Sequence, residues 1–135
     1  MSSLHAAFAA RWSDDPHLTE LLPASRFATA EQWPTESTPL PYSLCHIPNG
    51  RQGTYTSSGL LSGNCTLRVE VWSVSHAAGY AISRGIYNLF DNKSWKTLGI
   101  AVTFCRGSHP QEIQEEDGIW RFYIDFEVRY REESI

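Results

Sequence analysis

The amino-acid sequence predicts an α+β fold: an antiparallel β-sheet with a main helix and a short N-terminal helix packed on one face. Three observations support this prediction. Polar and apolar residues alternate along several segments, apolar residues recur at helical spacing over residues 76–90, and the elements follow the order helix, strands, helix, strands. The length of 135 residues suits one domain, so we treat residues 1–135 as a single domain.

The first elements are expected to be helical. Leu4, Ala7, Phe8 and Trp12 share one stripe of a short amphipathic helix over residues 3–12. A second helical turn is expected over residues 17–22, where Asp14 or Asp15 can cap its start and a proline follows its end.

Five segments read as strands. They cover residues 25–28, 42–47, 66–73, 100–105 and 120–131. In the third, Leu67, Val69, Val71 and Ser73 are expected to face the core. In the fourth, Ile100, Val102 and Phe104 share one face. The last strand alternates throughout and would extend about 33–36 Å, so it must either curve strongly or project beyond the core to meet a partner.

The main helix is expected to begin after Ser75, a good N-cap residue, and to end at residues 91–93. Its apolar stripe is predicted to include the following positions: Ala78, Ile82, Gly85, Ile86 and Leu89. Gly79 and Gly85 each lower helix propensity by about 1 kcal/mol, so tertiary packing must hold this helix in place.

Two segments are expected to lie outside the core. Residues 50–64 hold four of the nine glycines together with several Ser and Thr, which predicts a loop or a loose hairpin arm. Residues 106–118 form a long polar connection. Its four carboxylates, Glu112, Glu115, Glu116 and Asp117, are interpreted as a solvated hairpin loop, with a calcium or magnesium site as the alternative.

Composition excludes several classes of protein. Eleven Lys and Arg against 15 Asp and Glu give a formal net charge of −4, which argues against a general nucleic-acid binder. The sequence contains neither an apolar run of about 18 residues nor a positively charged start that would indicate a signal peptide. We therefore expect a protein that is not secreted, with no membrane partner and no specific nucleic-acid partner.

No motif for catalysis or cofactor binding occurs. Nucleotide-binding, metalloprotease and hydrolase signatures are missing, and the five histidines are scattered. The three cysteines, Cys45, Cys65 and Cys105, are widely spaced and are expected to be buried, reduced thiols. We assign no catalytic residue, cofactor or metal ligand, and we expect a protein that is not an enzyme.

Charges of both signs on the last strand suggest contact with other copies of the chain. A plain solvated face would show the same pattern, and Trp72 could be an exposed interface anchor or be covered by the N-terminal segment or the proline-rich loop. The candidate interface combines the glycine-rich arm, Trp72 and the exposed face of the last strand: Arg51, Tyr55, Leu60, Leu61, Trp72, Arg121, Asp125, Glu127, Arg129 and Arg131.

The sequence also resembles a known family. Residues 67–73 (LRVEVWS) lead through Ser75-His76-Ala77-Ala78 into a helix that ends at Leu89-Phe90. Upstream, Pro39-Leu40-Pro41-Tyr42 introduces a strand, and a long terminal strand follows at residues 120–131. In this order of elements the chain resembles phage tail-terminator and tail-completion proteins over nearly its whole length.

The resemblance implies a structural protein without catalytic residues. Such proteins assemble into a ring, commonly a hexamer, that stops polymerisation of the tail tube and presents a surface to the head connector. It implies tail-tube and connector proteins as partners, and a location in the virion or, for a prophage gene, in the host cytoplasm.

One alternative belongs to a different class. A curved sheet around a helix could form a pocket for a small apolar ligand, with or without enzymatic activity. The residues that would line this pocket are on the apolar face of the last strand: Trp120, Phe122, Phe126 and Tyr130. A deep cavity with a converging polar group would favour this alternative, and a filled core would remove it.

Overall fold

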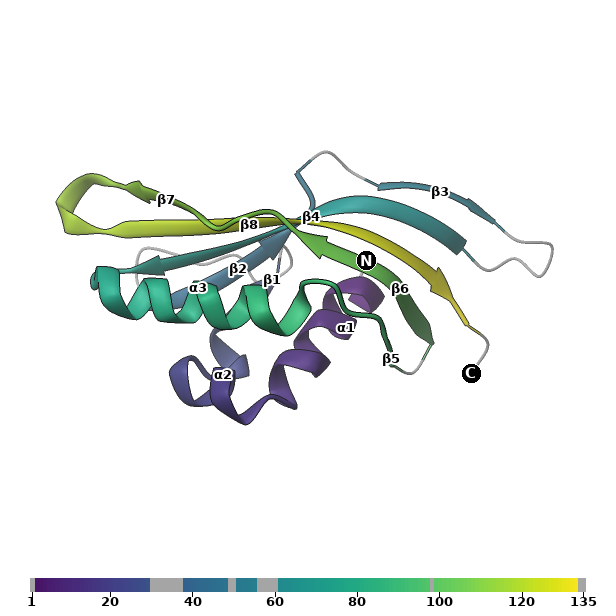
Figure 1. Cartoon of the computed structure of the whole chain (residues 1–135), viewed down its shortest axis with the longest axis horizontal. Coiled ribbons are helices and arrows are strands. Elements are labelled where there is room, and N and C mark those ends of the chain that lie inside the picture. The colour runs from purple at the N-terminus through teal and green to yellow at the C-terminus, as the bar shows by residue number, and fades with distance from the viewer. Residues whose placement is uncertain (1, 30–37, 49–50, 56–60, 98, 134–135) are drawn as a thin grey trace.

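The computed structural model describes residues 2–29, 38–48, 51–55, 61–97 and 99–133. Its elements, in chain order, are α1 (Ser2–Ser13), α2 (Pro16–Leu21), the 3-10 turn η1 (Ala24–Arg26), β1 (Phe27–Thr29), β2 (Tyr42–His46), β3 (Arg51–Tyr55), β4 (Leu61–Ser73), α3 (His76–Phe90), β5 (Trp95–Thr97), β6 (Ile100–Gly107), β7 (Gln111–Gln114), the 3-10 turn η3 (Glu116–Gly118) and β8 (Trp120–Glu132). The helices form one layer against one face of the sheet (Figure 1), which confirms the α+β prediction.

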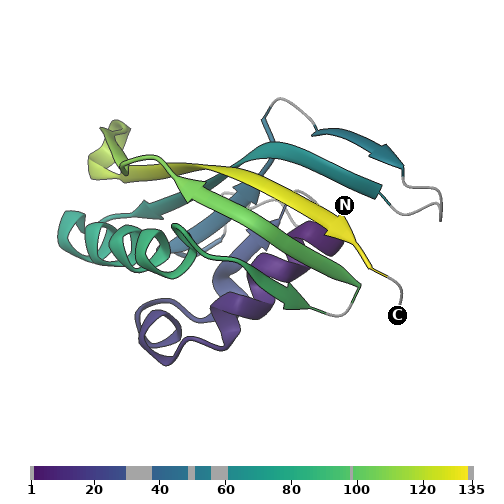
Figure 2. The same ribbon diagram turned by 45° about the vertical axis from the view of Figure 1, so that its right-hand side comes forward.

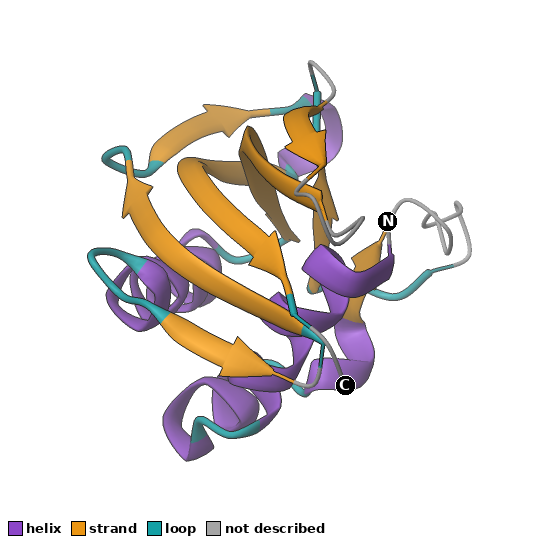
Figure 3. Ribbon diagram, turned by 90° about the vertical axis from the view of Figure 1, so that its right-hand side faces the viewer, coloured by secondary structure: helices purple, strands orange, loops and turns teal. Residues whose placement is uncertain are grey.

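The sheet is built on a ribbon of two long strands. β4 and β8 pair antiparallel from Ser62–Arg131 to Ser73–Trp120, and the strand order across the sheet is β1-β2-β4-β8-β6-β5. β3 extends the sheet beside the first half of β4, and β7 extends it beside the first half of β8. The pair β1–β2 is parallel and the other pairs are antiparallel, so the sheet is mixed at one edge. The curvature of the sheet, visible in Figure 2 and end-on in Figure 3, accommodates the length of β8.

The core lies between the sheet and the helices. Leu67, Val69 and Val71 of β4 are at most 1% exposed, as the alternation predicts. On the helical side, the ring of Phe8 packs 4.6 Å from that of Phe90 and 6.2 Å from that of Phe126. Burying one such side chain contributes about 1.5–3 kcal/mol, so these contacts hold α1 and α3 to the ribbon.

The predicted helix starts are confirmed by their caps. The carboxylate of Asp15 accepts a hydrogen bond from the Leu18 amide at 3.0 Å, and the Ser75 hydroxyl accepts one from the Ala78 amide at 3.2 Å. The α3 stripe is correct at Ile82, Gly85 and Ile86.

Several predictions from the sequence are wrong, including the start of the first strand, where Ala24–Arg26 form the 3-10 turn η1. Ala78 is exposed and its neighbour Gly79 is buried, because α3 turns its glycine toward Phe122. The sequence predicts that Ile100, Val102 and Phe104 share one face, but the register between β6 and β8 shifts between Val102 and Phe104, so Cys105 is buried and Phe104 only half-buried. A bulge of this kind reverses the alternation of the strand. Finally, residues 106–118 are not one long connection, because they contain β7 paired with β8.

Candidate assembly surface

The sheet has a second face, which points away from the helices, and we call it the outer face. Cross-strand register places side chains of β2, β4 and β8 there in rows: Tyr42 beside Trp72 beside Arg121, and His46 beside Arg68 beside Asp125. Glu70 and Tyr123 lie between these rows. The polar residues of the two central strands therefore meet on one surface, as the predicted alternation requires.

Glu70 is the centre of the outer face, and its side chain is only 9% exposed. One carboxylate oxygen lies 2.6 Å from Nε2 of His46. The other accepts hydrogen bonds from the indole N–H of Trp72 at 3.2 Å and from Arg121 at 3.4 Å. A carboxylate this buried is costly without partners, so these three donors fix the arrangement of the strands around it.

The environment of Glu70 extends to an aromatic pair. The ring of Tyr42 stacks on that of Trp72 with centroids 6.3 Å apart, and the guanidinium of Arg121 lies 5.5 Å from the Trp72 ring. Burial, and to a smaller extent the negative charge of Glu70, raises the pKa of Tyr42. Trp72 is half-buried between its neighbours on the sheet, an environment between the two alternatives that the sequence left open.

Arg68 and Asp125 form the best-defined ion pair of the outer face. They lie directly opposite each other on β4 and β8, and two guanidinium nitrogens donate to the two carboxylate oxygens at 2.7 and 3.0 Å. Arg68 also lies 4.4 Å from the ring centroid of Tyr123. Bidentate geometry makes such a pair stronger than an ordinary surface ion pair, so it stabilises this register.

The candidate interface residues therefore divide into groups. Trp72, Arg121 and Asp125 are bound within the chain, with Arg121 also donating to Glu115 at 2.9 Å. Glu127, Arg129 and Arg131 are exposed, and the pairs Arg129–Glu127 at 3.9 Å and Arg131–Glu133 at 3.4 Å contribute little at this exposure. Arg129 also lies 5.0 Å from the ring centroid of Phe104, and these weak contacts at exposed positions leave the three side chains accessible to a partner.

The glycine-rich arm is described only in part. The backbones of Arg51 and Tyr55 belong to β3, so the predicted hairpin arm is present as the pair β3–β4, but their side chains lie outside the described part. Leu60 also lies outside the described residues. Leu61 packs against the core and donates its amide to Glu132 at 2.7 Å, so its side chain is less available for contact than predicted.

The groups that could do chemistry are separated or buried. Cys45, Cys65 and Cys105 are buried thiols, and burial raises the pKa of Cys105 to about 12 and that of Cys45 well above its ordinary value. Among the described residues, no three His, Cys, Asp or Glu side chains are grouped so that they could hold a metal ion. In addition, no helix in the described part is long and apolar enough to cross a bilayer.

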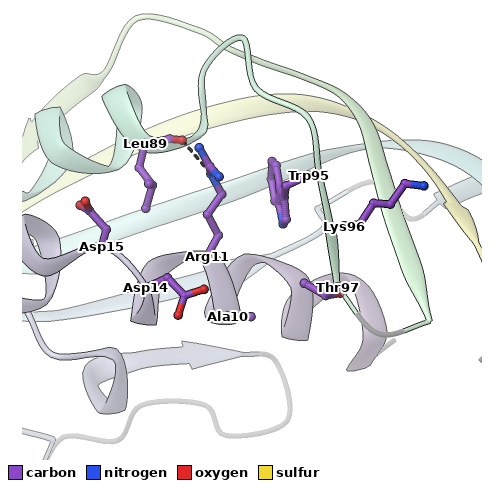
Figure 4. A pocket seen from close by; sticks show the side chains of 8 residues that line it. All are labelled: Ala10, Arg11, Asp14, Asp15, Leu89, Trp95, Lys96 and Thr97. Carbon is purple, nitrogen blue, oxygen red and sulfur yellow. Dashed lines mark hydrogen bonds between the residues drawn. The ribbon is translucent and has the colours of Figure 1, made fainter.

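The aromatic face of β8 is packed. Phe122, Phe126 and Tyr130 are at most 2% exposed, and Trp120 packs against the same core. An open hollow lies elsewhere, between α1 and β5, where Figure 4 shows Arg11 and Trp95 side by side. Arg11 donates to the carbonyl of Leu89 at 3.0 Å and lies 5.2 Å from the Trp95 ring, so its main polar contact is made within the chain.

Comparison with known proteins identifies a shared fold. No protein-family model matches the chain, and no curated protein matches it. Among solved structures, a chain of the virion of a native gene transfer agent particle superposes with a TM-score of 0.71 at 16% sequence identity, covering 95% of this chain and 94% of that one. A second solved chain superposes with a TM-score of 0.56 at 17% identity, covering 98% of this chain and 94% of that one. At these identities, the similarity establishes that the chains have the same fold over nearly their full lengths.

Proposed function

We propose that this chain is a structural protein of a phage, a prophage or a phage-like particle, and that it acts as a tail terminator. In this role it forms a ring on the tail tube and connects the tube to the head connector. The observation that carries the proposal is the full-length similarity in fold to a chain of a gene transfer agent virion, with a TM-score of 0.71. The family resemblance of residues 67–78 and 120–131 supports the same role from the sequence alone.

The physical character of the surface supports a role in assembly and not in catalysis. A ring requires two different patches that meet head to tail. The chain has two dissimilar ends, because β3 extends one corner of the sheet and β7 the opposite corner. The thiols are buried, and the aromatic face that could have lined a ligand pocket is packed in the core.

The first test is the oligomeric state. Native mass spectrometry and negative-stain electron microscopy of the purified protein, from micromolar to near-millimolar concentration, should show a closed ring, with six copies as the expected number. A strictly monomeric protein at every concentration would count against a ring that forms by itself.

The second test covers a ring that forms only on the tail. Deleting the gene from the particle that encodes it should leave heads and tail tubes that fail to join, with tubes of uncontrolled length in electron micrographs. Particles with normal, joined tails after the deletion would refute the proposed function, whatever the state of the purified protein.

A further inference from the structure

Two edge strands of the described sheet, β3 and β7, each have one unpaired side, and β7 also contacts α3, where Glu112 lies 3.0 Å from Nε2 of His76. Within the described part of the chain, β3 pairs only with β4 and β7 pairs only with β8. Each strand therefore has a second edge whose amides and carbonyls lack a partner strand, and such an edge is a ready template for pairing with another chain. Figures 1 and 2 show β3 and β7 at opposite ends of the sheet.

The other two edge strands are anchored to the helices through side chains. On β5, the Trp95 ring lies 5.1 Å from the ring of Phe8 and its indole N–H donates to the carbonyl of Ala7, so this strand is anchored to α1. On β1, Phe27 is only 6% exposed and packs 4.6 Å from the ring of Trp12. In contrast, all four residues of β7 are exposed, including Ile113, a large apolar side chain that is 36% exposed.

The two free edges differ in charge. Residues 108–119, which contain β7 and η3, carry four carboxylates and no Lys or Arg. With these four set aside, the other 11 acidic residues equal the 11 Lys and Arg, so this segment accounts for the whole formal charge of −4. At the opposite corner, residues 47–67 contain Arg51, on β3, as their only charged residue. Two of the four carboxylates, Glu112 and Glu115, already have partners within the chain in His76 and Arg121. The charges of Glu116 and Asp117 remain to complement the cation of the opposite edge, whereas two acidic edges would repel.

The directions of β3 and β7 would also allow them to pair between two molecules. β3 is antiparallel to β4, β4 to β8, and β8 to β7, so β3 and β7 of one molecule run in opposite directions. A neighbour placed without reversing its strands would therefore present β3 antiparallel to β7. Within one molecule the two strands lie about 30 Å apart along the ribbon, since β3 pairs with residues 61–65 of β4 and β7 lies level with residues 70–73.

We propose that a second copy of this chain is the partner of both edges: β7 of one copy adds to β3 of the next, and the sheet continues from subunit to subunit. Such a contact is heterologous, because it joins two different surfaces, and its repetition generates a ring or a filament. This inference depends on the proposed function for the closure of the ring, but the edge pairing itself can be tested separately.

Engineered cysteines test the pairing directly. Ile113 lies in register with Arg121, and Gln52 and Thr54 lie in register with Asn64 and Ser62, so all three positions belong to outer-face rows. Directly opposed cross-strand residues have Cβ atoms about 4.5–5.5 Å apart, close to disulfide geometry. We therefore expect the double variants I113C/Q52C and I113C/T54C to yield, between them, a ladder of oxidised multimers that ends at the ring number.

The matched control is I113C/K96C, which places the second cysteine on β5, the edge strand anchored to α1, where Lys96 is 67% exposed. It should show no ladder. A disulfide within one chain cannot produce the signal from β3, because about 30 Å separates the two strands and a disulfide spans less than 7 Å between Cα atoms. If neither β3 variant cross-links above this control, the edge pairing is refuted.

A second measurement does not depend on the register. Ile113→Lys places a charge on the free edge, which natural sheets use to prevent pairing, and should raise the concentration for half-assembly at least tenfold. Tyr80→Lys, a change at an apolar residue of α3 that is 51% exposed, should leave it unchanged. If the natural chain forms rings and Ile113→Lys forms them equally well, the pairing is wrong and the proposed function stands. If the natural chain forms no assembly on its own or on tails, the proposed function fails first.

Discussion

The spacing between α3 and the sheet depends on Gly79, and this can be measured against a second glycine in the same helix. A Cβ atom at Gly79 would lie 2.4 Å from Cε1 and 2.8 Å from Cδ1 of Phe122. That ring is 1% exposed and lies beside His76, so it has little room to move. A Cβ at Gly85 would meet the terminal methyl of Leu18 at 3.2 Å, and a flexible leucine can yield.

Both substitutions to alanine raise helix propensity by the same amount, about 1 kcal/mol, so this contribution cancels in the comparison. Overpacking against an immobile ring costs about 1–3 kcal/mol. We therefore expect Gly79→Ala to be less stable than Gly85→Ala by about 1–3 kcal/mol. With a urea dependence of about 2 kcal/mol per molar, the midpoints should differ by roughly 0.5–1.5 M.

The assay is equilibrium unfolding in urea, followed by tryptophan fluorescence. A further variant, Gly79→Ala with Phe122→Leu, should recover part of the loss relative to the sum of the single changes, because the leucine leaves room for the new methyl group. Equal stability of the two alanine variants, or no coupling between positions 79 and 122, would refute the close approach of α3 to β8.

Three further predictions concern the outer face and the core. Glu70→Ala removes the acceptor shared by His46, Trp72 and Arg121 and should lower the free energy of unfolding by about 1–3 kcal/mol. Glu127→Ala, at an exposed ion pair, should change it by less than about 0.5 kcal/mol, and equal losses in urea titrations of the two variants would contradict this prediction. Burial raises the pKa of Cys105 from an ordinary value of 9.0 to about 12, so the stability that the buried neutral thiol provides is present below pH 9 and is lost as the pH rises toward 12. The natural chain should therefore lose more stability in urea between pH 8 and pH 10.5 than the variant Cys105→Ala does. Phe126→Ala, which empties the centre of the aromatic cluster, should cost about 3–5 kcal/mol in the same titration, and a loss below 1 kcal/mol would show that the cluster is not packed as described.

Much of the fold follows from local patterns in the sequence. The caps Asp15 and Ser75, the alternation of β4 and the extent of β8 are all local signals, and each is confirmed. The errors occur where a distant contact decides the local structure. Gly79 faces the core at a point where the ring of Phe122 approaches too closely for a Cβ atom, and no pattern within α3 indicates that approach. The register shift between Val102 and Phe104 arises from pairing with β8, and the alternation of residues within one strand does not reveal that pairing.

The sequence predicts which residues share the outer face, but it does not predict which of them contact one another. Alternation places Arg68, Glu70 and Trp72 on one face, but it does not reveal that Glu70 is buried and shared by donors from three strands. Those donors come from residues 46, 72 and 121, which only the sheet topology brings together. β7 was missed because QEIQ is too short and too polar to stand out from a loop, and its partner strand provides the pairing.

The contacts within the outer face change which part of the molecule is available for assembly. The mixed charges of β8 first suggested salt bridges between copies, yet Arg121 and Asp125 already have partners within their own chain. Breaking a half-buried pair to form a new one gains little, because the desolvated partner left behind costs about as much as the new contact provides. Within the described part of the chain, groups that are open to a partner lie instead at the ends of the sheet, and they include the backbone edges of β3 and β7, the exposed Ile113 and the carboxylates of η3. The acidic segment of residues 108–119 lies at one corner of the sheet, and a corner of this kind suits a directional, head-to-tail contact better than a uniformly mixed face does.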